Sequence, residues 1–315
     1  MTRRREADVE ADHSRGGEGT DGGRGVLPPT LAPPDLDTLV LCQLAGLEAP
    51  LLRQLLDRWE TPTAILQAPS AALREAGLAP ALVARIVAAP RQQAAAAAGL
   101  QSLATLGIVP LPWLAPAYPA RLRESPAAPL LLYVQGRWPP AHPTVGYVTA
   151  GALDAAERAE VPVLLAALQA WGISVLATGS DVSLLPVAGS IAVLAAGMLL
   201  ARSQVPAGLR TSVGEGTATL LSVAPLTAQA TPALEAVAAT VLQALADGVV
   251  VAGTGAGPAP ARPDLHHWQL RAGGAANVGH AARPIRGGVA GAERIARVLG
   301  LRAVGVARVQ QERLW

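Results

Sequence analysis

The chain contains no lysine, no phenylalanine and a single cysteine, Cys42. One cysteine can form neither an internal disulfide nor a cysteine zinc cluster, so a reducing, cytoplasmic compartment is expected. Without lysine there is no Walker-type phosphate loop, because that loop needs its lysine on the bound phosphates. Cys42 lies between Leu41 and Leu44 on an apolar helical stripe, which predicts a core residue and not a nucleophile.

Other catalytic patterns are also missing. The sequence has no Gly-x-Ser-x-Gly elbow, and its carboxylates Glu215, Glu235 and Asp247 show no paired spacing. His266 and His267 are adjacent, so in an extended segment they face opposite sides, and no third ligand is spaced to close a metal site. We therefore expect no catalytic residue, no metal and no cofactor.

Two segments bear on whether the chain has a disordered tail and whether it crosses a membrane. Residues 6–25 are polar and glycine-rich where a signal peptide would have its apolar core, so no signal peptide is expected and residues 1–34 are predicted to form a disordered tail. The run Val182–Ala201 carries no charge and is long enough to span a bilayer. Pro186, Gly189 and Gly197 interrupt it where a loop, a buried strand and a turn would lie, so we expect no membrane segment.

Residues 35–104 are predicted to form a small helical domain, with leucines at helical spacing and prolines between the helices. The segment 73–86 has the helix, glycine turn, helix form of helix-hairpin-helix and sterile-alpha-motif (SAM) units, with Gly77 at the turn. Such a turn can hold a phosphate through its backbone N–H groups. The alternative is a helical bundle that packs or recruits without contacting nucleic acid.

The sequence pattern is different in residues 105–315, where apolar runs alternate with helical segments. This order predicts an α/β domain with a doubly wound, mostly parallel, Rossmann-like sheet, whose ligand crevice lies at the carboxyl ends of the strands. The predicted strands are 145–149, 173–177, 190–196, 219–223, 249–252 and 301–309, and the predicted helices are 155–171 and 233–246.

Four segments, in order, resemble motifs of the DprA/Smf family of DNA-processing proteins. They are Tyr118-Pro119-Ala-Arg-Leu122 with the following Pro129–Gly136, Leu176-Ala-Thr-Gly179-Ser-Asp181, Ser190-Ile-Ala-Val-Leu-Ala-Ala-Gly197, and Ala244-Leu-Ala-Asp247-Gly-Val-Val-Val251. The resemblance covers about residues 38–256. It implies a Rossmann-like domain that binds single-stranded DNA without catalysis, hands it to a RecA-type recombinase during DNA uptake, and forms a homodimer.

The chain departs from this family where basic residues would face phosphate. The family's Gly-x-Arg-x-x-Ser turn is replaced here by one with Gly151 at the arginine position and Asp154 at the serine position. Its Arg-Asn-Arg motif falls on residues 238–240, Ala-Ala-Thr, and the helix after Asp181 is shortened. Each lost phosphate contact weakens binding and its salt dependence, so we expect weakened binding of DNA.

The remaining candidates for phosphate contact are glycines at strand ends and two arginines near the C-terminus. Glycines let a backbone approach phosphate closely, whereas the alternative is that they only close turns. Arg294 and Arg297 lie three apart on one expected helix and could form a replacement patch. The full set is Gly179, Asp181, Gly197, Gly253, Thr254, Gly255, Arg294 and Arg297.

Three functions remain open from the sequence. The first is a divergent DprA-like protein that binds single-stranded DNA weakly and helps to load a recombinase. The second is a DprA paralogue that acts as an interaction or regulatory protein without binding DNA. The third is a nucleotide-binding enzyme of a related Rossmann-like family, which the absence of a Gly-Gly-x-Gly-Thr motif followed by a catalytic glutamate disfavours.

Overall fold

The computed structural model describes residues 31–301, except 142, 256 and 272–281. Most of the predicted tail (residues 1–30) and all but the first residue of the predicted strand 301–309 lie outside these ranges. The first described residue, Leu31, is buried, and it lies beside Leu100 and Ile108. The packed chain therefore begins before the predicted boundary at residue 35.

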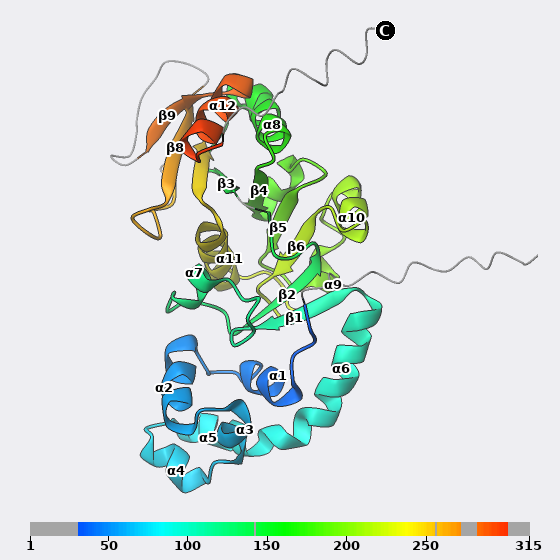
Figure 1. The fold of residues 1–315 in the computed structure, drawn as a ribbon, viewed down its shortest axis with the longest axis vertical. Coiled ribbons are helices and arrows are strands. Elements are labelled where there is room, and N and C mark those ends of the chain that lie inside the picture. The colour runs from blue at the N-terminus through cyan, green and yellow to red at the C-terminus, as the bar shows by residue number, and fades with distance from the viewer. Residues whose placement is uncertain (1–30, 142, 256, 272–281, 302–315) are drawn as a thin grey trace, which may run out of the picture.

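The N-terminal part is a helical domain, blue to cyan in Figure 1. Proline occupies the first turn of several of its helices, where the missing N–H costs nothing. Gly77 has a φ of 83° and joins α4 to α5, as the sequence predicted. The helices are α1 (Leu36–Cys42), α2 (Ala49–Trp59), α3 (Pro62–Gln67), α4 (Ser70–Glu75), α5 (Pro80–Ala88), η1 (Ala89–Gln92) and α6 (Gln93–Thr105).

The rest of the described chain is built on one sheet in the order β1-β2-β6-β5-β4-β3-β7-β8-β9. All pairs from β6 to β9 are parallel, whereas β1 and β2 are antiparallel additions at one edge. The strands are β1 (Ile108–Pro112), β2 (Leu131–Gly136), β3 (Thr144–Thr149), β4 (Ser174–Thr178), β5 (Ser190–Leu194), β6 (Thr219–Ser222), β7 (Gly248–Ala252), β8 (His266–Arg271) and β9 (Arg283–Arg286).

Helices cover both faces of this sheet, which confirms the predicted doubly wound, Rossmann-like α/β class. The connection β3-α8-β4 runs one way along the sheet and β6-α11-β7 runs the other, so right-handed crossovers place α8 and α11 on opposite faces. Helix α12 packs on α8. The remaining helices are α7 (Ala120–Arg123), α8 (Ala155–Ala170), η2 (Gly179–Leu184), α9 (Met198–Ala201), α10 (Ala207–Gly214), α11 (Pro232–Leu245) and α12 (Gly288–Val298).

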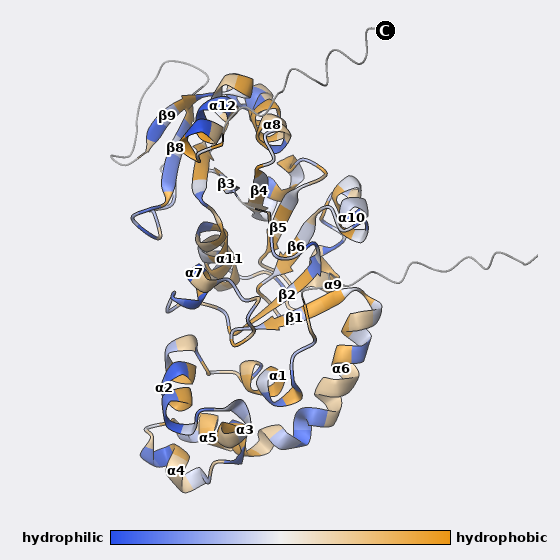
Figure 2. Ribbon diagram, viewed as in Figure 1, coloured by the Kyte–Doolittle hydropathy of each residue, from blue (hydrophilic) through white to orange (hydrophobic). Residues whose placement is uncertain are grey.

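The uncharged run Val182–Ala201 forms part of η2, the buried strand β5 and the short helix α9, in agreement with the predicted loop, strand and turn. Within the described ranges, every helix is too short or too polar to cross a membrane. Figure 2 shows apolar residues in β1, β5 and β6 and hydrophilic residues on β8.

The segment that carries the Tyr-Pro motif lies between β1 and β2. The Arg123 guanidinium donates to the carbonyl oxygens of Trp113, Ala115 and Tyr118 at 3.0, 2.7 and 3.3 Å. The Tyr118 hydroxyl donates to the Pro129 carbonyl at 2.7 Å, just before β2. Burial raises the pKa of Tyr118 far above its ordinary value, so this hydroxyl stays protonated and acts as a donor.

The same segment contacts both neighbouring parts of the fold. Arg53 on α2 donates to the Arg123 carbonyl at 3.2 Å and lies over the Trp113 ring. The Trp138 indole donates to the Ala117 carbonyl at 3.0 Å. We call residues 113–123 the Tyr-Pro segment.

Glycine at position 248 is required by the packing of β7 against β8. A Cβ at Gly248 would overlap the ring of Trp268, which is almost completely buried and has no room to move. We predict that Gly248→Ala lowers the free energy of unfolding by about 2 kcal/mol, measured by urea denaturation. Gly99→Ala, in α6 with open space around its Cβ, is the control and should raise it by about 0.5 kcal/mol. Equal effects of the two variants would contradict this packing.

His267 generates a prediction about pH. Its side chain faces away from His266, which stacks on Trp268 at 5.6 Å, and only 8% of His267 is exposed. Its Nε2 has no hydrogen-bond partner among the described residues. Burial lowers the pKa of His267 below its ordinary value, so the unfolded chain takes up this proton first as the pH falls.

The protein should therefore lose stability as the pH falls through about 6.5, the ordinary histidine value, towards the lower folded pKa. The His267→Gln variant should lose less stability than the wild-type protein between pH 7.5 and pH 5.5, measured by urea denaturation at each pH. An unchanged slope in this variant would contradict a buried, neutral His267.

Candidate functional site

The strand order reverses between β3 and β7, and ligands of open α/β sheets bind where the carboxyl ends of two such strands diverge. Here β3 ends at Thr149 and continues into Ala150 and Gly151, and β7 ends at Ala252 and continues into residues 253–255. We call this region the switch crevice. It contains Gly253, Thr254 and Gly255, three of the residues predicted to contact phosphate.

The two loops of the switch crevice are hydrogen-bonded to each other. The Gly255 N–H donates to the Ala150 carbonyl at 2.7 Å, and the Thr254 N–H donates to the Ala152 carbonyl at 3.1 Å. A Cβ at Gly255 would come within 3.0 Å of the Ala150 carbonyl, which shows how closely the backbones approach. These amides are therefore engaged within the chain and are not directed at a ligand.

Carboxylates accept hydrogen bonds from further backbone N–H groups of the switch crevice. Asp154 begins α8 with a capping box: its carboxylate accepts from the Glu157 N–H at 2.7 Å, and Glu157 accepts from the Asp154 N–H at 3.0 Å. The second oxygen of Glu157 accepts from the Gly253 N–H at 3.3 Å. The positive end of α8, the usual phosphate site of this fold, is therefore occupied by two acids of the chain itself.

Asp181 completes this arrangement from the neighbouring strand β4. It lies in η2, and its carboxylate accepts from the Thr149 N–H at 2.7 Å, across the carboxyl end of β3. Beside it, the Tyr147 hydroxyl and the Thr149 hydroxyl are 2.9 Å apart, and burial raises the pKa of Tyr147 to about 12. Asp181, predicted to lie near a bound phosphate, is thus an internal acceptor that fills the place of an anion.

Three acids, Asp154, Glu157 and Asp181, therefore meet at the switch crevice. A nucleic-acid phosphate would face their repulsion and would have to displace hydrogen bonds that are already made. Among the described residues no group of three or more histidines, cysteines or acids could hold a metal ion.

The other predicted glycines lie elsewhere. Gly197 caps α9 after β5, its N–H donates to the Ala228 carbonyl at 2.7 Å, and a Cβ there would overlap the backbone of Pro225 and Leu226. Gly179 starts η2 with a φ of 60°, and space is open around its Cβ. Gly197 thus closes a turn, and only Gly179 lies next to the crevice, two residues from Asp181.

The positions of the family's Arg-Asn-Arg motif are on α11. Ala238 is completely buried, so an arginine there would require the helix to repack. Basic residues gather instead at the far end of the sheet. Arg283 and Arg286 on β9 and Arg294 on α12 are exposed, and Figure 2 shows that β9 and parts of α12 are hydrophilic. Arg297 forms an ion pair with Glu293 at 2.9 Å, so it is partly neutralised.

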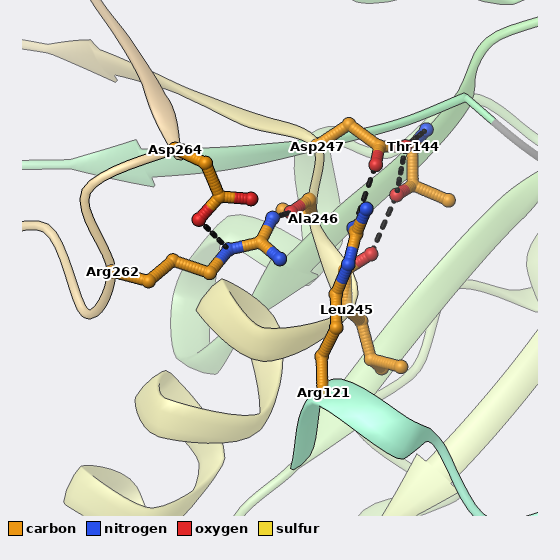
Figure 3. Close-up of polar contacts among 7 residues, drawn as sticks. All are labelled: Arg121, Thr144, Leu245, Ala246, Asp247, Arg262 and Asp264. Carbon is orange, nitrogen blue, oxygen red and sulfur yellow. Dashed lines mark hydrogen bonds and ion pairs between the residues drawn. The ribbon is translucent and has the colours of Figure 1, made fainter. Parts of the chain in front are cut away.

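Asp247, which is not among the predicted site residues, organises the opposite, amino ends of the strands (Figure 3). One carboxylate oxygen pairs with the Arg121 guanidinium at 2.7 Å. The other accepts from the Thr144 N–H at 2.9 Å and the Thr144 hydroxyl at 3.2 Å. Only 19% of the Asp247 side chain is exposed, so this contact ties the Tyr-Pro segment to the start of β3 and β7.

Cys42 is buried, as predicted, and it lines a cavity of about 820 Å³ between the helical domain and the ends of β2 and β6. Burial raises the pKa of the Cys42 thiol to about 12. The thiol is therefore protonated at neutral pH and is a poor nucleophile.

Comparison with known proteins rests on structure. No protein-family model matches the chain, and no curated protein sequence matches it significantly. DNA processing protein A (DprA) from Streptococcus pneumoniae matches with a TM-score of 0.56 and 14% identity, over 84% of this chain and 98% of that chain. DprA from Helicobacter pylori, described for its single-stranded DNA binding mode, matches with a TM-score of 0.37 and 11% identity, over 61% of this chain and 88% of that chain. The chain therefore has the fold of the pneumococcal DprA.

The contacts of Asp247 generate a prediction. In Asp247→Asn the carboxamide keeps the shape but loses the charge that Arg121 and Thr144 share, and its NH₂ group cannot accept hydrogen bonds. We expect the free energy of unfolding to fall by about 2–3 kcal/mol in urea denaturation. Asp264→Asn is the matched control: Asp264 is 67% exposed, so its effect should stay within about 0.5 kcal/mol. A similar loss in both variants would show that Asp247 has no special role.

Proposed function

We propose that this protein is a DprA-type DNA-processing protein that binds single-stranded DNA weakly and helps to load a RecA-type recombinase. The observation that carries this proposal is the match to the pneumococcal DprA, which extends over 98% of that protein. Because the match covers 84% of this chain, it extends beyond the Rossmann-like sheet alone. On this proposal the protein is not an enzyme and acts as a cytoplasmic homodimer.

The contacts within the switch crevice support a low affinity for single-stranded DNA. The N–H groups of Thr149, Gly253 and Gly255 already donate within the chain, and where the family has an arginine and a serine this chain has Gly151 and the acid Asp154. Contact with DNA would then move to the exposed arginines of β9 and α12: Arg283, Arg286 and Arg294. Three phosphate contacts give single-strand binding a salt slope of only about −2, because each contributes about 0.7.

Fluorescence anisotropy of a labelled oligo-dT tests the proposal. The wild-type protein should bind with micromolar affinity at low salt and weaken by roughly twentyfold between 50 and 200 mM salt. Replacing Arg283, Arg286 and Arg294 together by glutamine should abolish binding. Replacing Arg74, Arg91 and Arg202, which are also exposed, removes the same charge elsewhere and should leave at least half of the affinity.

Equal loss in both triple variants would show that net charge, and not the β9–α12 surface, attracts the strand. If only the Arg74, Arg91 and Arg202 variant loses oligo-dT binding, the DNA contact lies near the helix, glycine turn, helix unit of α4 and α5. No binding by the wild-type protein at low salt would contradict the proposal.

A second candidate is favoured by the crevice itself: a DprA-fold protein that acts through protein partners and does not bind DNA. The internal carboxylates Glu157 and Asp181 complete the hydrogen bonding of the crevice without a ligand. This candidate predicts no anisotropy change at any salt concentration, together with binding of the purified protein to a RecA-type recombinase in the absence of DNA.

A further inference from the structure

A second polar region lies at the amino ends of β3, β7 and β8, on the opposite side of the sheet from the switch crevice. A pocket of about 480 Å³ opens there, and we call it the amino-end pocket. Its polar lining comes from segments far apart in the sequence: Arg121, Asp247, Arg262, Asp264 and His266.

Arg262 is the least compensated charge of this pocket. Only 17% of its side chain is exposed, and one of its terminal nitrogens donates to the Ala246 carbonyl. Its Nε is fully buried and has no hydrogen-bond partner among the described residues. The nearest carboxylate oxygen to this nitrogen belongs to Asp264 at 3.5 Å, and Asp264 is 67% exposed, so water screens its charge.

Arg121 adds a second positive charge to the same pocket. Burial, and then the charge of Arg121, lower the pKa of Arg262, which means that the two guanidinium groups repel each other across a partly dry space. Asp247 relieves this only in part, because its carboxylate also accepts from the backbone and the hydroxyl of Thr144. Figure 3 shows the two arginines approaching residues 246 and 247 from different elements.

A tetrahedral oxyanion at these donors competes with Asp264, whose charge is exposed and screened by water, and lies beside Asp247, whose charge is already paired with Arg121. Guanidinium groups bind phosphate through paired N–H donors, and His266 lines the same pocket with its ring held by stacking on Trp268 at 5.6 Å. A neighbouring cavity of about 440 Å³ shares Arg121 and Asp247 with the pocket. Its walls include Pro119, Pro139 and Leu245, which suit a planar or apolar group.

We propose that the amino-end pocket binds the phosphate group of a small phosphomonoester, such as a nucleoside monophosphate, through Arg121, Arg262 and His266, with the organic part in the neighbouring cavity. This site does not depend on single-strand binding by β9 and α12. The phosphate could belong to a mononucleotide or to the 5′ end of a strand, and the experiment separates these sources.

Isothermal titration calorimetry tests the site with inorganic phosphate, dTMP, thymidine, and oligo-dT with and without a 5′-phosphate. We expect dTMP to bind more tightly than inorganic phosphate, and thymidine to show no binding. Arg262→Gln should weaken dTMP binding at least tenfold. Arg202→Gln, at an exposed arginine outside the pocket, should leave it unchanged. Tighter binding of the 5′-phosphorylated oligomer than of dTMP would identify a strand end as the source.

NMR of the histidine rings gives a readout that does not need a variant. On addition of dTMP the signals of His266 should shift, whereas those of His267, buried on the other side of the same strand, should not. If Arg262→Gln does not fold, Arg121→Gln takes its place in the calorimetry. The proposal is overturned if the wild-type protein binds neither inorganic phosphate nor dTMP at 10 mM, if binding survives these substitutions, or if His266 does not respond.

Discussion

The fold depends on the Tyr-Pro segment, and within it on the Arg123 guanidinium that gathers three backbone carbonyls. The mostly irregular backbone between β1 and β2 needs partners for its carbonyl groups, and one planar, always charged side chain supplies several at once. From this segment Tyr118 reaches the start of β2, Arg121 reaches Asp247, and Arg53 reaches in from the helical domain. The motif that resembles the DprA family is therefore explained by architecture, and it says nothing by itself about a ligand.

The same fold can be kept while its usual ligand position is filled from within. The N–H groups at the carboxyl ends of the central strands need acceptors, and a bound phosphate is one way to provide them. Here Asp181 and Glu157 provide them instead, with Asp154 at the start of α8. An internal carboxylate is always present, so these N–H groups have acceptors whether or not a ligand is bound.

The parallel strands could be predicted from the sequence because buried strands are continuous apolar runs, as in β5 and β7. Strands β8 and β9, the last two strands at one end of the sheet, could not, since they carry polar residues such as His266 and Arg283 that produce no such run. Part of the acidic crevice could be predicted from the sequence, because Asp154 and Glu157 have the spacing of a capping box. The pairing of Arg121 with Asp247 joins residues 126 positions apart, and no local pattern reveals a contact of that kind.

Mapping of backbone amide signals by NMR during titration with oligo-dT tests the account most directly, because it separates the switch crevice from every other surface in one experiment. We predict shifts for amides of β9 and α12 and none for Thr149, Gly253 or Gly255, whose N–H groups already have acceptors within the chain. Shifts centred on those three amides would show that DNA displaces the internal carboxylates, and would contradict a crevice closed from within.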